Sequence, residues 1–268
     1  MDDSGRKLIV LFGDSLTQLG YCEEGWVSSL NASCVRRAHV HNFGFNGYNT
    51  RCAIQVLDRV FPLRFAGSSV SNNFPDFVTV CFGVNDAALP NQGEASVQHV
   101  PLNEYYDNLV HILRHIKSMS TSAGKTPEIT VIGVLPPNEI GRNAYLRQKY
   151  PEKNIPTSFR DRTADTARKY SQAAKQAALT SGCTFLDMFN VFLTESKSSK
   201  LSELLKCDGL HLSRKGNFVF WDALHKHICE FFPHLHLFDL KKTDFPGPER
   251  ILNFTVPGKT TSLQNTRE

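Results

Sequence analysis

The sequence predicts a three-layer α/β/α fold built on a mostly parallel, five-stranded sheet. Short apolar runs, rich in β-branched and aromatic residues, alternate along the chain with longer segments of helical periodicity. Such alternation places helices on both faces of a parallel sheet, and the crossovers between its strands are expected to be right-handed. The predicted strands cover residues 7–12, 39–43, 76–82, 129–135 and 184–189.

The first predicted strand is the clearest, because an uninterrupted apolar run stops abruptly at Gly13. Asp14, Ser15 and Thr17 follow it and place polar side chains at the carboxyl end of the strand. Ligands of open α/β sheets bind outside that end, so Ser15 is positioned to act as a nucleophile, and a helix beginning here would direct free backbone N–H groups at a negative charge beside it. The alternative is that Ser15 or Thr17 only caps that helix, and this stretch alone leaves both interpretations open.

Two further predicted strands also end in polar turns. The second strand leads into residues 42–50, a turn dense in Gly and Asn that includes Gly44. The third is followed at once by residues 83–86, which include Asn85. Because neighbouring parallel strands end at one edge of a sheet, we expect these turns and Ser15 to lie close together. Taken singly, each turn is more simply explained as a tight connection from strand to helix.

Five segments have the apolar spacing of amphipathic helices, and Ser213 is predicted to cap the last of them. His111 and His115 have an i, i+4 spacing that can hold a metal, but no third ligand is evident, so a packing or surface role is favoured. The same interpretation applies to His225 and His227 in the last helix. The predicted helices cover residues 26–35, 53–61, 101–116, 161–179 and 213–231.

Other segments lack a clear pattern. Residues 67–73 and 87–100 are predicted to be polar loops, and residues 195–206 to be only weakly helical. Residues 138–156 are irregular and basic, with tyrosines interleaved among arginines and lysines. This stretch is either a cap over the site or a solvated excursion, and the sequence favours neither.

Composition excludes several classes of protein. The 268 residues are 41% hydrophobic and 21% charged, which is ordinary for a globular protein, and residues 1–235 are predicted to form one domain, with 236–268 a partly disordered extension. The net charge of +4 comes from dispersed lysines and arginines, so a nucleic-acid partner is not indicated. A membrane span is not expected, and the polar start together with seven scattered cysteines predicts a cytoplasmic protein with reduced thiols.

Asp208 and His211 stand three residues apart in a loop just before the last predicted helix. Both side chains can therefore point into the same space. Alone, the pair would be explained as a turn aspartate and an unrelated histidine. Together with Ser15, they supply the nucleophile, the base and the orienting carboxylate that serine hydrolases require.

The order of these motifs resembles the SGNH (GDSL-type) hydrolase superfamily. Residues 13–17 (GDSLT) look like its first block, Gly44 like its second, residues 83–86 (GVND) like its third and residues 208–211 (DGLH) like its fifth. Each block is short, but four in order at predicted strand ends form a specific joint signal. The runs GFNGYNTR and HVPLNEY also resemble the isoamyl acetate-hydrolysing esterase branch of that superfamily.

This resemblance, which covers roughly residues 7–232, implies a flavodoxin-like fold and hydrolysis of carboxylic esters. It assigns Ser15, His211 and Asp208 to a catalytic triad. The backbone N–H groups of Ser15 and Gly44 and the side-chain amide of Asn85 are expected to bind the oxyanion. Asp14 and Asp86 flank the expected site and would fix its turns. The implied partner is a small-molecule ester, and the chemistry requires no metal or organic cofactor.

Substrate size is predicted from the two segments nearest the expected site. Residues 138–156 are charged and residues 87–100 are polar, so we expect no apolar trough for a long acyl chain and a preference for short, acetate-like acyl groups. The same blocks also serve thioesterases, lysophospholipases and carbohydrate deacetylases, and an inactive binding module is a further alternative. The absence of a G-x-S-x-G motif argues against the nucleophile-elbow hydrolases.

Overall fold

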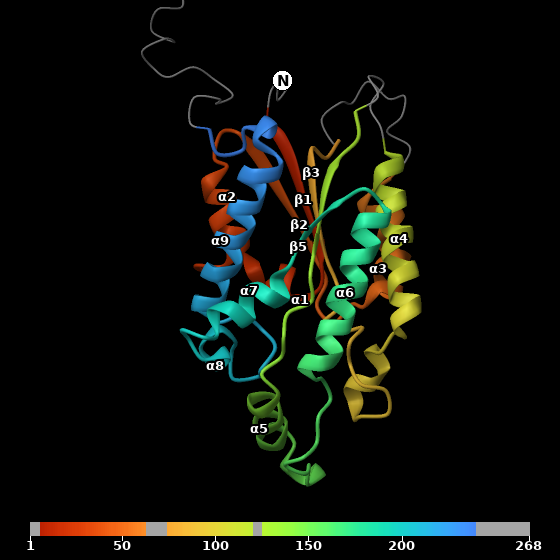
Figure 1. The fold of residues 1–268 in the computed structure, drawn as a ribbon, viewed down its shortest axis with the longest axis vertical. Helices are drawn as coiled ribbons and strands as arrows, with labels where there is room; N and C mark the ends of the chain where they lie inside the picture. Colours follow the sequence, from red (N-terminus) through yellow and green to blue (C-terminus); the bar gives the residue numbers. More distant parts are fainter. Residues whose placement is uncertain (1–5, 63–73, 120–124, 240–268) are drawn as a thin grey trace, which may run out of the picture.

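The computed structural model describes residues 6–62, 74–119 and 125–239 (Figure 1). Within these ranges five strands form one sheet in the order β2-β1-β3-β4-β5, and every pairing between neighbours is parallel. The predicted fold class is therefore confirmed. The strands are β1 (Lys7–Gly13), β2 (Ala38–Gly44), β3 (Phe77–Cys81), β4 (Glu128–Ile132) and β5 (Thr184–Leu186).

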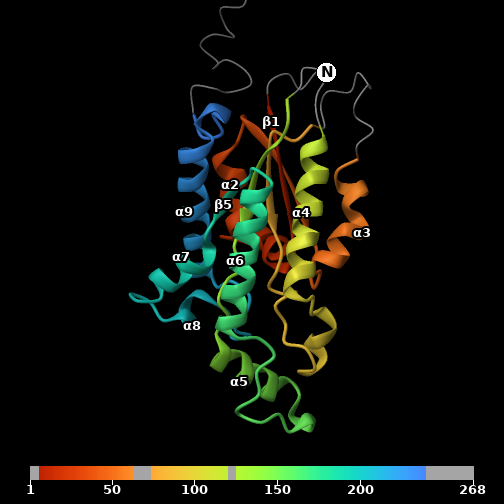
Figure 2. The same cartoon turned by 45° about the vertical axis from the view of Figure 1, so that its right-hand side comes forward.

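Helices cover both faces of the sheet, as Figures 1 and 2 show. One face packs against α3 (Thr50–Val60), α4 (Leu102–Ser118) and α6 (Ala164–Thr180). The opposite face packs against three other helices and forms a second core. These are α2 (Trp26–Ser33), α7 (Met188–Glu195) and α9 (Arg214–Phe231).

Strand β1 explains why the sheet needs both layers. Its side chains alternate between the two cores, with Val10 and Phe12 in the first and Ile9 and Leu11 in the second. All four are almost fully buried. Burying one such side chain contributes roughly 1.5–3 kcal/mol, so a strand in this position must be apolar on both faces. The continuous apolar run that precedes Gly13 in the sequence is the consequence.

Helix α5 (Glu139–Lys149) and the short 3₁₀ helix η5 (Pro151–Lys153) occupy the segment predicted to be irregular. That prediction was wrong. The helix is capped by the Asn138 side chain, which accepts a hydrogen bond of 3.1 Å from the Gly141 N–H. Its buried residue is the polar Asn143, whereas Ile140 is 78% exposed, so no apolar stripe marks the helix in the sequence.

Two strand ends also differ from the predictions. Strand β5 stops at Leu186 because the Asp187 side chain caps α7, accepting a hydrogen bond of 3.1 Å from the Asn190 N–H. Residues 188–189, predicted as strand, therefore begin a helix. Strand β4 ends at Ile132 rather than at residue 135. The weakly helical segment holds the end of α7 and the short helix α8 (Leu201–Leu204).

Two of the histidines that could suggest a metal, His115 and His227, have other partners. The His115 ring lies 2.8 Å from the Phe61 carbonyl, and the His227 ring lies 3.0 Å from the Thr184 hydroxyl. The described residues contain no group of three or more potential metal ligands. Across the same ranges, no helix combines the length and apolar character needed to cross a bilayer. The predicted loop at 67–73 and all of the predicted extension beyond residue 239 lie outside the described residues.

Candidate active site

The register of the sheet brings three strand ends level with one another. Gly13 at the end of β1 pairs with Gly44 of β2 on one side and with Cys81 of β3 on the other. The next residue, Asp14, donates its N–H to the Cys81 carbonyl at 3.2 Å. The polar turns that follow β1, β2 and β3 therefore meet at one edge of the sheet, as the sequence predicts.

Ser15 is the first residue of the short helix α1 (Ser15–Gln18) and is almost fully buried. The cap of this helix is Asp14, whose side chain accepts a hydrogen bond of 2.9 Å from the Leu16 N–H. Neither Ser15 nor Thr17 makes the capping bond. The capping role that the sequence left open for Ser15 thus belongs to its neighbour, and the Ser15 hydroxyl is available for other contacts.

Ser15, His211 and Asp208 form a continuous line of polar contacts. The Ser15 Oγ lies 2.9 Å from His211 Nε2, and His211 Nδ1 lies 2.6 Å from Asp208 Oδ2. With its proton on Nδ1, the neutral imidazole donates to Asp208 and accepts from Ser15. This arrangement can take a proton from the serine hydroxyl and hold the resulting positive charge beside a carboxylate.

The Asp208 carboxylate is prepared for that role by its hydrogen bonds. Burial alone would raise the pKa of Asp208, but donation from the His211 ring and from the backbone N–H groups of Leu210 and His211 holds this pKa well below its usual range. Both backbone bonds are 3.0 Å long and end on Oδ1, which leaves Oδ2 for the imidazole. Asp208 therefore stays ionised wherever His211 could act as a base.

The loop that carries Asp208 and His211 packs tightly against the start of α5. Gly209 has φ +71°, and a Cβ atom on it would lie 2.6 Å from the Asn138 carbonyl oxygen, so only glycine fits. The Asn138 N–H donates to the Gly209 carbonyl at 2.9 Å. Residues 138–156 therefore begin in contact with the loop that carries Asp208 and His211, and their role as a cap over the site stays a prediction.

Asn85 also lies at the sheet edge, with only 6% of its surface exposed. Its Nδ2 donates to the Tyr48 carbonyl at 2.8 Å, and its Oδ1 accepts from Arg162 Nη2 at 3.5 Å. An amide nitrogen carries two protons, so one N–H of Asn85 is left for a further acceptor. That N–H is available for the oxyanion role that the sequence analysis expects, and the role itself stays a prediction.

Gly44 differs from its expected role in one respect. Its N–H donates to the Asn42 side chain at 2.8 Å, and a Cβ atom at this position would lie 2.0 Å from the Gln18 backbone nitrogen. The small size of Gly44 is thus explained by close packing against α1. Unlike the Gly44 N–H, the N–H groups of Gly47 and Ser15 have no hydrogen-bond acceptor among the residues that the structure describes. Gly47 has φ +80°, which glycine adopts readily.

Two buried carboxylates hold the turns in place. Burial raises the pKa of Asp14 to about 7, although the Leu16 N–H opposes the shift. Burial also raises the pKa of Asp86 to about 6, in spite of hydrogen bonds from the Thr50 N–H at 2.9 Å and hydroxyl at 2.5 Å. Asp86 thereby ties the turn after β3 to the first residue of α3. Both residues fix turns, as the sequence analysis expects.

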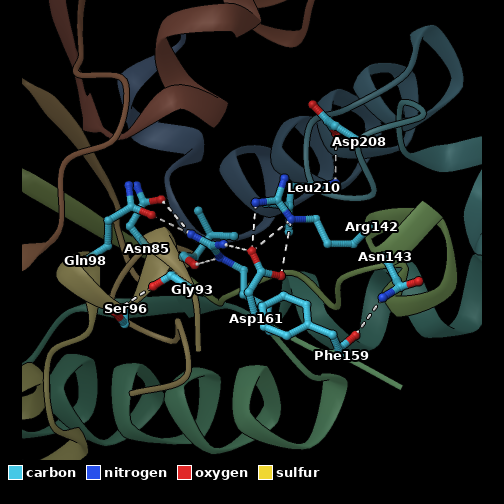
Figure 3. Close-up of polar contacts among 12 residues, drawn as sticks. Asn85, Gly93, Ser96, Gln98, Arg142, Asn143, Phe159, Asp161, Asp208 and Leu210 are labelled. Carbon is cyan, nitrogen blue, oxygen red and sulfur yellow. Dashed lines mark hydrogen bonds and ion pairs between the residues drawn. The ribbon is translucent and has the colours of Figure 1, made fainter. Parts of the chain in front are cut away.

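The sequence analysis missed a cluster of buried charges beside Asn85. Asp161 is 2% exposed and accepts hydrogen bonds from two arginines, Arg142 at 2.8 Å and Arg162 at 2.9 Å. Figure 3 shows Asp161 and Arg142 facing each other, with Gln98 and Asn85 nearby. The adjacent opposite charges at 161–162 were the available signal, but an Asp-Arg pair between a loop and a helix is usually exposed to solvent.

Two hollows of very different size lie in this part of the molecule, a small one at the triad and a large one beside Gln98, Arg142 and Asp161. A cavity of about 10 Å³ touches Ser15 and His211, and its other walls are Leu16, Leu19, Gly20, Lys206, Leu212 and Asn217. A groove of about 750 Å³ runs between residues 92–98 and residues 142–161. Its walls include Val97, Tyr145, Leu146, Tyr150, Ile155 and Phe159. The expectation that these two segments offer no apolar trough is therefore wrong.

The chain is similar to known proteins in both sequence and fold. A family model described as GDSL-like Lipase/Acylhydrolase matches residues 11–217. A GDSL esterase/lipase of Arabidopsis thaliana is 36% identical, over 84% of this chain and 87% of that protein. The isoamyl acetate-hydrolyzing esterase 1 homolog of Homo sapiens is 35% identical over 82% of both. The solved structure of an acetyl xylan esterase matches with a TM-score of 0.60 at 15% identity, covering 82% of this chain and 99% of its own, and so bears on the fold alone.

Proposed function

We propose a catalytic route and a substrate class on the premise that the chain belongs to the GDSL-like lipase/acylhydrolase family, as its sequence motifs predict, and is a hydrolase acting on esters. In this proposal, Ser15 is the nucleophile, His211 the general base and acid, and Asp208 the residue that orients the imidazole. The observation that carries it is the line of contacts from Ser15 Oγ through His211 to Asp208, at 2.9 and 2.6 Å.

The reaction runs in two halves. Ser15 Oγ attacks the ester carbonyl carbon while its proton passes to His211 Nε2, and the tetrahedral intermediate then collapses with release of the alcohol, which takes that proton. Water attacks the acyl group on Ser15 in the second half, and His211 again accepts and returns a proton. The carboxylic acid leaves and the Ser15 hydroxyl is restored, so the side chains of the protein return to their starting state.

The oxyanion of each intermediate requires donors that are already in place. We assign the Ser15 N–H and the remaining Asn85 N–H to this role. The third donor is the Gly47 N–H rather than that of Gly44, because the Asn42 side chain already occupies the Gly44 N–H. The Gly47 turn is held at the site from both sides, since Asn85 donates to the Tyr48 carbonyl and Gln98 Nε2 donates to the Gly47 carbonyl at 3.1 Å.

The two hollows support a small acyl group joined to a larger alcohol. The cavity beside Ser15 has room for little more than one water molecule or a methyl group, which suits an acetyl group. The groove of about 750 Å³ is within the usual range of ligand pockets and would receive the alcohol part. The name of the 35%-identical human relative, an isoamyl acetate-hydrolyzing esterase homolog, is consistent with esters of this shape. The cytoplasmic location stays a prediction.

Labelling with a fluorophosphonate probe tests the proposed nucleophile. The probe reacts with an activated serine, so the wild-type protein should be labelled and the Ser15→Ala variant should not. Unfolding with urea before addition of the probe should abolish labelling, because an unactivated serine hydroxyl is a weak nucleophile. Equal labelling of the folded wild type and the folded Ser15→Ala variant would reject Ser15.

A further inference from the structure

The Arg162 side chain reaches Asn85 from another part of the chain. It is 5% exposed, and its Nε donates to the carbonyl of Val84 at 3.0 Å while its Nη2 lies 3.5 Å from Asn85 Oδ1. One guanidinium thus contacts both the backbone just before Asn85 and the Asn85 side chain. We infer that Arg162 is a positioning residue that holds the Asn85 amide with an N–H group directed at the reaction centre. This inference rests on the proposed role of Asn85.

The two partners of the Asn85 amide fix its orientation without ambiguity. A guanidinium carries only donors, so Arg162 can pair only with the oxygen end of the amide. A backbone carbonyl only accepts, so the Tyr48 carbonyl can pair only with the nitrogen end. Rotation of the amide by 180° would place donor against donor and acceptor against acceptor. Without Arg162, only the Tyr48 contact would oppose other side-chain rotamers of Asn85.

Arg162 is itself held on two further sides. Its Nη1 donates to Asp161 Oδ2 at 2.9 Å, and its Nη2 donates to Gln98 Oε1 at 2.6 Å. The Gln98 amide then donates to the Gly47 carbonyl at 3.1 Å, so the chain of contacts returns to the turn that Asn85 touches. Figure 3 shows Gln98, Asn85 and Asp161 converging on the same region. The guanidinium therefore has little freedom to move away from Asn85.

Charge adds to this geometric effect. Burial lowers the pKa of Arg162 to about 10, which leaves the guanidinium protonated at neutral pH. Asp161 is shared with Arg142, so the three side chains together carry a net positive charge. A cation at the oxygen end of the Asn85 amide polarises it and strengthens donation from the nitrogen end.

A double-mutant cycle distinguishes positioning from general structural support. Arg162→Met should lower kcat for p-nitrophenyl acetate about 10- to 100-fold and change KM less than about threefold, because the lost interaction acts on the transition state. In an Asn85→Ala background, the same substitution should lower kcat by less than about threefold, since the group on which Arg162 acts is gone. An equal factor in both backgrounds would show that Arg162 only supports the fold, and would overturn the inference.

Two further variants keep the test decisive. Arg142→Met removes a cation from the same Asp161 without reaching Asn85, so whatever factor it produces should be the same in both backgrounds. If circular dichroism shows that Arg162→Met is unfolded, Arg162→Lys is used in its place. Lysine keeps the charge but cannot contact both the Val84 carbonyl and the Asn85 side chain. Arg162→Lys should lower kcat by a smaller factor than expected for Arg162→Met, and this effect should disappear in the Asn85→Ala background. If Asn85→Ala itself leaves kcat unchanged, the proposed oxyanion role fails, and that outcome is distinct from an additive cycle.

Discussion

The two sides of Ser15 are built in different ways. On one side, Asp208 and His211 are three residues apart, their loop is fixed by bonds within the same few residues, and the adjoining cavity is about 10 Å³. On the other side, Asn85 contacts Arg162, 77 residues away, and a groove of about 750 Å³ begins at Gln98 and Asp161, the neighbours of Arg162. In the proposed mechanism, the first side performs proton transfer in a closed space, and the second binds the oxyanion and the substrate in an open one. Substitutions should therefore have sharper effects on the first side.

The largest effect is expected at the nucleophile. Ser15→Ala should lower kcat on the order of 10³-fold or more, because no acyl-enzyme can form, while the oxyanion donors preserve a residual rate. Steady-state hydrolysis of p-nitrophenyl acetate gives the number, and thermal unfolding gives the control. A folded Ser15→Ala protein with near-normal turnover would show that Ser15 is not the nucleophile.

The side of Ser15 that carries Asn85, which we call the donor side, should give a somewhat smaller loss of kcat. Removing one oxyanion donor lowers kcat about 10²- to 10³-fold, so Asn85→Ala should fall in this range with KM little changed. Measuring kcat and KM separately is essential. If KM rises and kcat is unchanged, Asn85 positions the substrate and does not bind the oxyanion.

A pair of isomeric esters tests the two hollows. Hexyl acetate and ethyl hexanoate have the same atoms, but the long chain lies on the alcohol in one and on the acyl group in the other. Each methylene received by an apolar surface contributes about 0.8 kcal/mol, so kcat/KM for hexyl acetate should be higher by about tenfold or more. The opposite order, measured below any micelle threshold, would assign the groove to the acyl chain.

A matched pair of variants ties this preference to the groove. Tyr145 lines the groove from α5, so Tyr145→Ala should lower kcat/KM for hexyl acetate several-fold while changing the value for ethyl acetate less than about twofold. Ile140 lies on the same helix, is 78% exposed and does not line the groove. Ile140→Ala is therefore the control, and an equal effect of both substitutions would contradict the assignment.

The smallest effect concerns the turn that both sides share. Asp14 has its pKa raised from 3.8 to about 7 by burial, so the folded state keeps this proton at pH values where the unfolded chain loses it. Its contribution to stability is present below pH 3.8 and is lost as the pH rises through about 7. Between pH 5 and 6, the free energy of unfolding of the wild type should fall by about 1 kcal/mol relative to Asp14→Asn. Urea titrations measure this, and parallel pH profiles would exclude a buried, protonated Asp14.

The sequence predicted the features that depend on local pattern. Strand β1 could be predicted because both of its faces are buried, which requires a continuous apolar run. The predicted cap at Ser213 is confirmed by a hydrogen bond of 3.1 Å that its side chain accepts from the Gly216 N–H. The Asp208–His211 spacing is equally local. Helix α5 could not be recognised, because its one buried residue is polar and the contacts that stabilise it come from elsewhere in the chain.

The donor side shows the limits of local pattern most clearly. The motifs place a Gly-rich turn at the sheet edge, but which N–H is left unpartnered depends on where the Asn42 side chain folds. The partner of Asn85 was equally hidden, because Arg162 belongs to a segment that carries no recognised block. Long-range contacts of this kind are set by the tertiary fold and leave no periodic signal in the sequence.

The most direct test of the proposed mechanism is to identify the residue that carries the acyl group. The wild-type protein is mixed with p-nitrophenyl acetate, quenched in acid within milliseconds, and digested with trypsin, and the peptide covering residues 8–36 is fragmented in a mass spectrometer. We expect an acetyl group on Ser15, absent from the Ser15→Ala variant and from wild-type protein that has exhausted its substrate. An acetyl group on another residue, together with undiminished turnover in Ser15→Ala, would contradict the proposed mechanism.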